Sequence, residues 1–342
     1  MKAHSPRRAA LTACYILLAL VSVSIGATPV PAETPETDPV VIRYLNDRGY
    51  VPPFEIADAL GLLEGTGVRL KLEGYSPGGP KSLAALNSGA VDVAGAATPA
   101  IINAIADGAG ILCVIPRAGV TKDVNSKFFV LADSPISRAE DLKGRSIAVN
   151  ALGAHLDYTI REYLRLHGLN GDDVKLVKVP GSQLDQALRQ RQADVAAVGV
   201  WQAPIASKIA AEGGVRVLFT DHDVLGDIVL ASNAMKRTFI DRHPQAVRAF
   251  ATASAKAVDW VAAHPGEARR LVAQLLKKRG EDPAGAADWS GYGLREHALY
   301  EDHDTQFWLD LLVRAGKLKP GQFSPDDIAT NKYNADAWPA RH

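Results

Sequence analysis

The stretch GGPKSLAALNSGAVDVAG, residues 78–95, decides the fold, because a similar stretch recurs 102 residues later as GSQLDQALRQRQADVAA, residues 181–197. The copies share small, apolar and acidic residues at matching positions: Gly79/Gly181, Ala85/Ala187, Leu86/Leu188, Asp92/Asp194, Val93/Val195 and Ala94/Ala196. Each copy predicts a small-residue turn, a short helix and then an apolar strand. Such units build a parallel sheet that is buried on both faces. A repeat in constant register favours two similar α/β lobes with the functional site between them, although any two helix–strand units of one domain also look alike.

The rest of the chain continues the α/β pattern. Apolar runs predict strands at 40–45, 68–72, 91–95, 111–115, 127–131, 146–149, 174–179, 195–198, 215–218 and 228–231. Beyond Met235 the sequence predicts helices throughout, and we expect this helical tail to pack on the first lobe. Lobe one is then residues 39–126 plus 229–342, lobe two is residues 127–228, and the crossings near 127 and 228 form a two-strand hinge.

The N-terminus has the layout of a secretory signal peptide. Lys2, Arg7 and Arg8 precede an apolar run over residues 9–27, and a Pro/Thr/Glu-rich stretch follows. We assign residues 1–32 to the signal peptide and expect the protein to be exported. An N-terminal membrane anchor is the alternative, but the run is short for a spanning helix and Ser22 and Ser24 interrupt it.

Charge, cysteine content and motifs exclude several functional classes. The full chain has 38 Lys+Arg and 38 Asp+Glu, without a basic run, so neither nucleic acid nor an anionic membrane surface is an expected partner. Without residues 1–32 only Cys113 remains, which leaves no disulfide and no cysteine metal site. The sequence holds no phosphate-loop lysine and no HExxH motif. We therefore expect no cofactor and no catalytic residue.

Several loops at the carboxyl edge of the predicted sheets are suited to bind an anion. Helices that begin at Thr98 and His155 expose unpaired amides and a partial positive charge. Arg48 and Arg117 are predicted to lie in loops at this edge, where each is either a forked donor to an oxyanion or a surface arginine. His155 is either a ligand donor or a helix residue that only faces the cleft.

Two further features have a binding and a structural interpretation. Tyr50 and Trp201 could wall the apolar part of a ligand, and core packing is the alternative for Trp201. His297 and Glu301 lie four residues apart and could form half of a metal site. A solvated helix face or loop is the favoured interpretation of that pair, so we expect no metal site.

Over nearly its whole mature length the chain resembles the periplasmic substrate-binding proteins of ABC importers for sulfonate, taurine, nitrate and thiamine-pyrimidine ligands, the SsuA/THI5-like family. The matching segments are LNSGAVDVAGAATPAI (86–101), FFVLADSPISRAEDLKGRSIAV (128–149), NALGAHLDYTIREYLRLHGL (150–169), RQRQADVAAVGVWQAP (189–204) and LASNAMKRTFIDRHPQAVRAF (230–250). The resemblance implies a type II periplasmic-binding-protein fold, a periplasmic location, a monomer and delivery of a small organic anion to an ABC permease in the inner membrane.

The resemblance also implies ligand contacts at specific loops and helix starts. These are Arg48, Gly49, Tyr50, Gly78, Gly79, Thr98, Gly153, Ala154, His155, Trp201, Gln202 and the segment Asp223–Asp227. Within that segment Asp227 is the residue expected to contact the ligand. Arg117 completes the predicted set.

Three functional hypotheses follow. The first is an exported binding protein that closes on a small organic anion, with a sulfonate or related oxyanion favoured, and is not an enzyme. The second is an enzyme on the same scaffold, such as a pyrimidine synthase or a small-molecule lyase, which requires a proton-transfer residue with an orienting partner in the cleft. The only local pair is His155 with Asp157, and residues two apart on a helix point to different sides. The third is a sensory protein that reports its ligand to a membrane partner.

Overall fold

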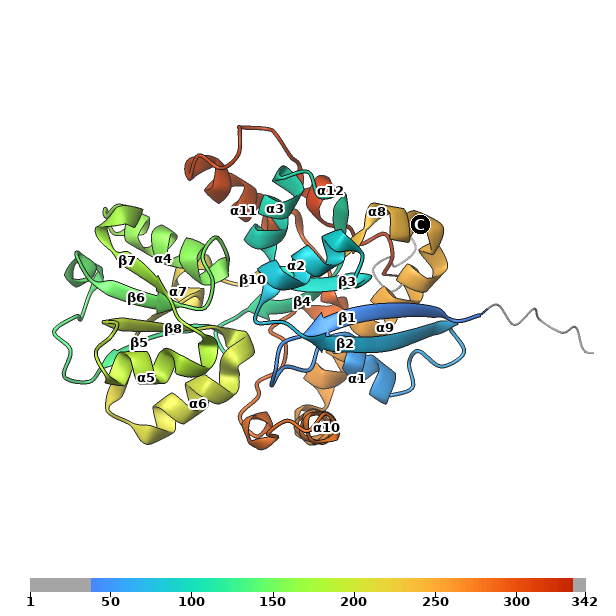
Figure 1. Cartoon of the computed structure of the whole chain (residues 1–342), viewed down its shortest axis with the longest axis horizontal. Coiled ribbons are helices and arrows are strands. Elements are labelled where there is room, and N and C mark those ends of the chain that lie inside the picture. Colours follow the sequence, from blue (N-terminus) through green and yellow to red (C-terminus); the bar gives the residue numbers. More distant parts are fainter. Residues whose placement is uncertain (1–37, 335–342) are drawn as a thin grey trace, which may run out of the picture. The chain divides into compact units, whose positions relative to one another are not determined.

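Two five-stranded sheets organise residues 38–334, the part of the chain that the computed structural model describes (Figure 1). The predicted signal peptide lies outside the described residues. In the first sheet the strand order is β2-β1-β3-β10-β4. Its strands are β1 (Val40–Asn46), β2 (Val68–Tyr75), β3 (Val93–Ala97), β4 (Ile111–Val120) and β10 (Ile228–Lys236).

The second sheet repeats this arrangement with different strands. Its order is β7-β6-β8-β5-β9. The strands are β5 (Lys127–Leu131), β6 (Ser146–Val149), β7 (Lys175–Lys178), β8 (Val195–Val198) and β9 (Val215–Thr220). In each sheet the first three strands are parallel, and the fourth, β10 or β5, is antiparallel to its neighbours.

The chain crosses between the sheets twice. It leaves the first sheet at the end of β4 and enters the second through β5, then returns after β9 through β10. This is the predicted architecture of two α/β lobes joined by two crossings, and the predicted fold class is confirmed. The residue boundaries of the lobes, near 127 and 228, stay a prediction.

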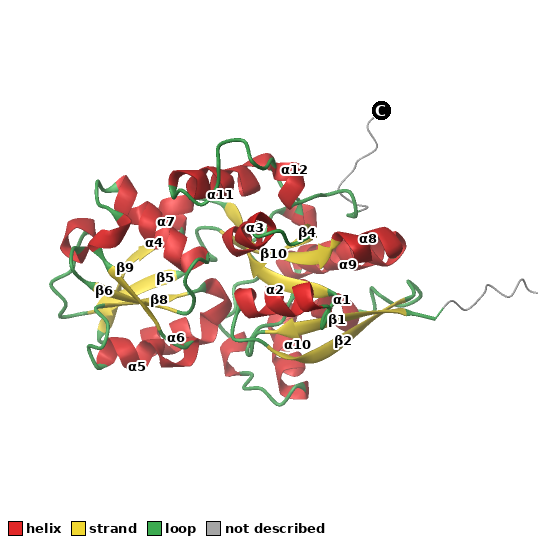
Figure 2. Ribbon diagram, turned by 45° about the horizontal axis from the view of Figure 1, so that its top comes forward, coloured by secondary structure: helices red, strands yellow, loops and turns green. Residues whose placement is uncertain are grey.

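Helices cover both faces of each sheet (Figure 2). Around the first sheet they are α1 (Pro53–Ala59), α2 (Gly79–Ser88), α3 (Thr98–Ala106), α8 (Arg237–Arg242), α9 (Pro244–Ala263), α10 (Pro265–Lys278), α11 (Asp302–Arg314) and α12 (Pro325–Ile328). Around the second sheet they are α4 (His155–Leu166), α5 (Leu184–Arg189), α6 (Ala203–Glu212) and α7 (His222–Leu225).

Successive side chains of a strand point to opposite faces of its sheet, so each sheet has a separate hydrophobic core on each face. In β3, Val93 joins the core that contains α1 and α9, whereas Ala94 joins the core that contains α2, α3 and α11. Phe54 of α1 and Phe250 of α9 pack with ring centroids 5.2 Å apart. In β6, Ile147 faces α4 and Ala148 faces α5 and α6. The C-terminal helices therefore pack on the first sheet, as the sequence predicted.

The structure corrects three local predictions. The strand predicted over 111–115 continues to Val120, so Arg117 lies in β4 and not in a loop. The strand predicted over 228–231 continues to Lys236, because it pairs with both β3 and β4. The tail is not helical throughout, since only short 3-10 turns, Ala284–Ala286 and Glu296–Ala298, lie between α10 and α11.

One further property of the described helices concerns their length and hydropathy. Within residues 38–334, none combines the length and the apolar character that crossing a membrane requires.

Candidate functional site

A small cavity lies where loops from the two lobes meet, with a volume of about 60 Å³. It is lined from the first lobe by Asp47, Tyr50, Gly78, Gly79, Pro80, Gly95, Ala96, Ala97, Ala100, Arg117, Ala118 and Ala231. From the second lobe it is lined by Asn150, Ala151, Ala154, His155 and Trp201. Mostly glycine and alanine line the cavity, so the few polar side chains among them determine what it can bind.

Arg117 reaches this cavity because β4 bulges at that residue. Ala231 of β10 pairs with Ala118, and the next residue, Ser232, pairs with Pro116, which leaves Arg117 without a partner opposite it. A bulge of this kind redirects one side chain out of the regular alternation. The Arg117 side chain is only 6% exposed. Its Nη1 passes over Gly95, where an added Cβ would lie 1.9 Å from it, so a larger residue there would displace the guanidinium.

Tyr50 and the end of β1 hold the guanidinium in place. The ring centroid of Tyr50 lies 4.4 Å from the Arg117 Cζ, and the Tyr50 hydroxyl donates to the Arg117 carbonyl at 3.0 Å. Burial raises the pKa of Tyr50 to about 12, so this phenol stays neutral. Arg117 Nη2 donates to Asn46 Oδ1 at 3.2 Å and to Asp47 Oδ2 at 3.1 Å. Burial also raises the pKa of Asp47, while Arg117 acts in the opposite direction.

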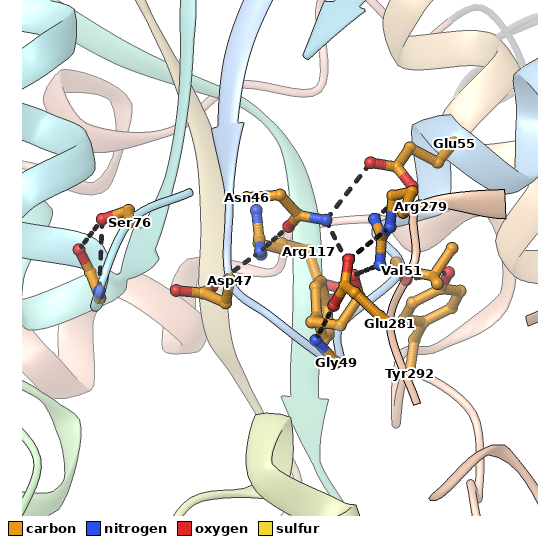
Figure 3. Close-up of polar contacts among 12 residues, drawn as sticks. Asn46, Asp47, Gly49, Val51, Glu55, Ser76, Arg117, Arg279, Glu281 and Tyr292 are labelled. Atoms are coloured by element: carbon orange, nitrogen blue, oxygen red, sulfur yellow. Dashed lines mark hydrogen bonds and ion pairs between the residues drawn. The ribbon is translucent and has the colours of Figure 1, made fainter. Parts of the chain in front are cut away.

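The loop after β1 is fixed by the C-terminal part of the chain (Figure 3). Glu281, just beyond α10, accepts the Gly49 amide and, at 2.9 Å, the Tyr75 hydroxyl. Arg279 donates to the Tyr50 carbonyl at 2.8 Å and pairs with Glu55 at 2.7 Å and with Glu281 at 2.8 Å. The loop that supplies Asp47 and Tyr50 to the cavity is therefore held by charges from the tail.

His155 forms a buried pair that the sequence did not predict. Its Nε2 lies 2.7 Å from Asp221 Oδ2, and both side chains are fully buried. The second Asp221 oxygen accepts the Ser126 amide at 2.8 Å, so the pair ties the start of α4 to both crossings between the lobes. His155 Nδ1 is buried without a hydrogen-bond partner among the described residues.

Trp201 has both of the roles that the sequence left open. It lines the cavity, and it packs against core residues of the first lobe and of the second.

Gly79 contributes by its small size, because a Cβ there would lie 2.9 Å from the Ala96 Cα. Glycine at this position lets helix α2 start close to Ala96 of β3 without displacing it.

The predicted site residues divide into two groups. The cavity brings together Tyr50, Gly78, Gly79, Arg117, Ala154, His155 and Trp201. The other six lie outside its lining. In the first lobe, Arg48 is exposed and stacks on Tyr75, the Gly49 amide donates to Glu281, and the Thr98 hydroxyl donates to the Leu230 carbonyl. In the second lobe, the Gly153 carbonyl accepts from Asn103, the Gln202 side chain accepts the Gly199 amide, and Asp227 pairs with His222.

Sequence reasoning missed Asp47 and Asn150, which line the cavity at the ends of β1 and β6. Both directly follow a predicted strand or stand one residue beyond it, and that position was the available signal. His297, which was considered as half of a metal site and disfavoured, contacts Asp259 through its Nδ1 at 2.8 Å. Residues 38–334 contain no group of three or more metal-ligating side chains.

A larger groove of about 730 Å³ runs between α3, α4 and α11. Several of its charged side chains pair with one another, as Glu162 does with Arg165 at 2.8 Å and with Arg314 at 3.3 Å. We place the candidate site in the smaller cavity because the buried Arg117 lines it and donates to described residues only through Nη2.

Comparison with known proteins identifies related chains. The family model described as "NMT1/THI5 like" matches residues 50–268. A binding protein of Brucella abortus is 26% identical over 330 residues, which cover 94% of this chain and 98% of the relative. An aliphatic sulfonates-binding protein of Escherichia coli is 30% identical over 219 residues, 63% of this chain and 65% of the relative. Among solved structures, the periplasmic aliphatic sulphonate binding protein SsuA of Escherichia coli superposes with a TM-score of 0.66 at 20% identity and covers 84% of this chain and 91% of its own.

Proposed function

Because the chain belongs to the NMT1/THI5-like family, we propose that it is an exported binding protein which captures a small organic oxyanion between its lobes and delivers it to an ABC permease. A sulfonate is the favoured oxyanion, since a related protein of Escherichia coli is described as binding aliphatic sulfonates. The periplasm is the proposed location, and residues 1–32 are the proposed signal peptide.

The observation that carries this proposal is the buried guanidinium of Arg117. Its Nη2 is engaged by Asn46 and Asp47, whereas its Nε and Nη1 make no hydrogen bond to a described residue. A guanidinium presents parallel N–H groups that match the oxygens of a sulfonate or carboxylate. The free edge of Arg117 is therefore a forked donor already in position.

Residues of both lobes are proposed to close on the ligand. The first lobe supplies Arg117, and the second supplies Trp201 and the start of α4 with His155. The N-terminal amides of α4 add a favourable potential for an anion, worth about 0.3 to 1 kcal/mol. A ligand that contacts both lobes stabilises the closed arrangement by the contacts that it makes only there.

The enzyme alternative gains one observation, the His155–Asp221 pair, because it joins a proton-transfer residue to an orienting carboxylate. We nevertheless favour a structural role for this pair, since Asp221 also holds Ser126 at the crossing. A cysteine could serve an enzyme as a nucleophile, but the only described cysteine, Cys113, is buried in β4 and does not line the cavity. Recovery of a chemically altered ligand would reverse this preference.

A thermal-shift titration with small sulfonates and carboxylates tests the proposal. The melting temperature of the wild type is expected to rise with ligand concentration. In Arg117→Gln the affinity is expected to fall about 10- to 100-fold, because a charge-assisted hydrogen bond contributes about 1.5 to 3 kcal/mol.

The matched control is Arg69→Gln, which removes an exposed arginine from β2. Since Arg117→Gln also leaves Asp47 unpaired, the ligand-induced shift is compared and not the melting temperature itself. An equal shift in wild type and Arg117→Gln would place the binding site elsewhere.

A further inference from the structure

The Arg117 side chain lies in a space that Gly95 leaves open on one face of the first sheet. Its Nη1, Cζ and Cδ pass 1.9, 2.5 and 2.8 Å from the place where a Gly95 Cβ would be. Strand β3, which carries Gly95, lies between β1 and β10. The side chains of β1 and β10 that stand beside Gly95 on this face therefore flank the Arg117 side chain.

On the β1 side the flanking residue is Asn46. Tyr44 pairs with Val93, so Asn46 stands beside Gly95, two residues further along the parallel strands. Asn46 Oδ1 accepts from Arg117 Nη2 at 3.2 Å (Figure 3). One side of the guanidinium is thus held by an asparagine.

On the β10 side the flanking residue is Asn233, a second asparagine. It pairs with Gly95 in the antiparallel register, so its side chain stands on the same face of the sheet as the space above Gly95. Asn233 is fully buried, and neither its Nδ2 nor its Oδ1 has a hydrogen-bond partner among the described residues. A buried amide without a partner costs free energy, so its presence beside Arg117 calls for an explanation.

The hydrogen-bond capacity of Arg117 provides this explanation. A guanidinium carries five N–H groups, of which two are on Nη2. Asn46 and Asp47 accept from Nη2, which leaves the three N–H groups of Nε and Nη1 without an acceptor among the described residues. An oxyanion that binds as a fork takes two of them. One buried N–H group then remains, and leaving it unpaired is costly.

We propose that Asn233 is a positioning residue for Arg117, and that in the ligand-bound protein its amide oxygen accepts the N–H group that the oxyanion leaves unused. This inference rests on the proposed function. Asn46 and Asn233 then hold the guanidinium from both sides, so the two other N–H groups meet the oxyanion in a fixed plane. Asn233 acts through Arg117 and does not contact the ligand, since it lies outside the cavity lining.

Asn233→Leu tests this role, because leucine has nearly the shape of asparagine but no acceptor. Titration calorimetry with ethanesulfonate and with propanoate measures the affinity. For a probe that binds the wild type, we expect the affinity to fall about 3- to 10-fold in the variant. The free energy of unfolding without ligand should stay equal or rise, because an unpaired buried amide is replaced by an apolar group. A residue that only packs would not weaken binding while the fold keeps its stability.

Ser232→Ala is the matched control. Ser232 is the neighbouring residue of β10, is also buried, and points to the opposite face of the sheet. Its replacement should change the affinity by less than about twofold. Unchanged affinity in Asn233→Leu, or an equal loss in Ser232→Ala, overturns the inference and leaves the binding function in place. Failure of both probes to bind the wild type overturns the proposed function, and the inference with it.

A crystal structure of the wild type with the bound probe decides the question even if Asn233→Leu folds poorly. We expect Asn233 Oδ1 to lie about 3 Å from Nε or Nη1 of Arg117. A separation of more than about 3.5 Å from both nitrogens overturns the inference, whether or not the probe is bound to Arg117.

Discussion

Glu281 is the residue through which the C-terminal tail reaches the ligand loop. It accepts the Gly49 amide and the Tyr75 hydroxyl and pairs with Arg279. Glu281→Gln keeps the size of the side chain but loses its charge, so the loop carrying Asp47 and Tyr50 should loosen. We predict a fall in ligand affinity of about 3- to 10-fold, close to 1 kcal/mol.

Hydrogen exchange at the Gly49 amide is the readout that separates positioning from general stability. Exchange of that amide should accelerate in Glu281→Gln and stay unchanged in Glu267→Gln, which alters an exposed acid in the first turn of α10. Unchanged exchange at Gly49 in Glu281→Gln contradicts the positioning role.

Single residues were predictable where a local pattern marked them. Tyr50 and Trp201 stood in loops after predicted strands, and the structure places both in the cavity lining. Glu281 could not be found this way, because its partner Gly49 lies 232 residues earlier. Arg117 was expected in a loop because Pro116 and Arg117 interrupt the apolar run. Its strand position depends on pairing with β10, which no local pattern contains.

At the scale of elements, the sequence repeat proves to be a repeated contact between parallel strands. Asp92 accepts the Arg43 amide of β1 at 3.0 Å, and Asp194 accepts the Ser146 amide of β6 at 2.8 Å. In each lobe the aspartate just before the strand of the repeat unit, β3 or β8, holds the central parallel strand. Burial acts to raise the pKa of both aspartates, but the hydrogen bonds from Arg43 and Ser146 outweigh it and lower the pKa.

A lowered pKa in the folded state means that the ionised aspartate stabilises the fold above its unfolded pKa of about 3.9, and that this contribution is lost as the pH falls through the folded value. Asp92→Asn should lower the free energy of unfolding by about 1 to 2 kcal/mol at pH 7. Asp194→Asn should cost less, because its side chain is 34% exposed and solvent screens it. Urea unfolding at pH 7 and near pH 3 measures both effects. A difference from the wild type that persists undiminished at the lower pH contradicts this account.

The glycines that open the two repeat units differ in what surrounds them. A Cβ on Gly79 would lie 2.8 Å from the Ala96 Cβ and 2.9 Å from its Cα, whereas a Cβ on Gly181 meets the movable end of Gln202. Gly79→Ala should therefore destabilise the fold by about 1 to 3 kcal/mol through overpacking. Gly181→Ala, the matched control, should cost much less. Equal losses in denaturant unfolding contradict this contrast.

At the scale of the whole molecule, residues 38–334 contain two sheets with equivalent strand orders. The sequence repeat predicted this similarity, because its constant spacing of 102 residues lies within the chain itself. The contacts that join the two lobes could not be predicted from the sequence, since they connect segments that lie far apart along the chain. Asn103 of α3 donates to the Gly153 carbonyl at 3.2 Å and to the Tyr158 hydroxyl at 3.1 Å, and Arg314 of α11 pairs with Glu162 of α4 at 3.3 Å. These contacts hold α4, and with it His155, against the first lobe.

The most direct test of the central claim is a crystal structure of the protein grown with a short alkanesulfonate such as ethanesulfonate. We predict the ligand in the cavity between the lobes, with a sulfonate oxygen about 3 Å from Arg117 Nη1 or Nε. A ligand bound only outside this cavity, or an empty cavity at saturating concentration, would contradict the account.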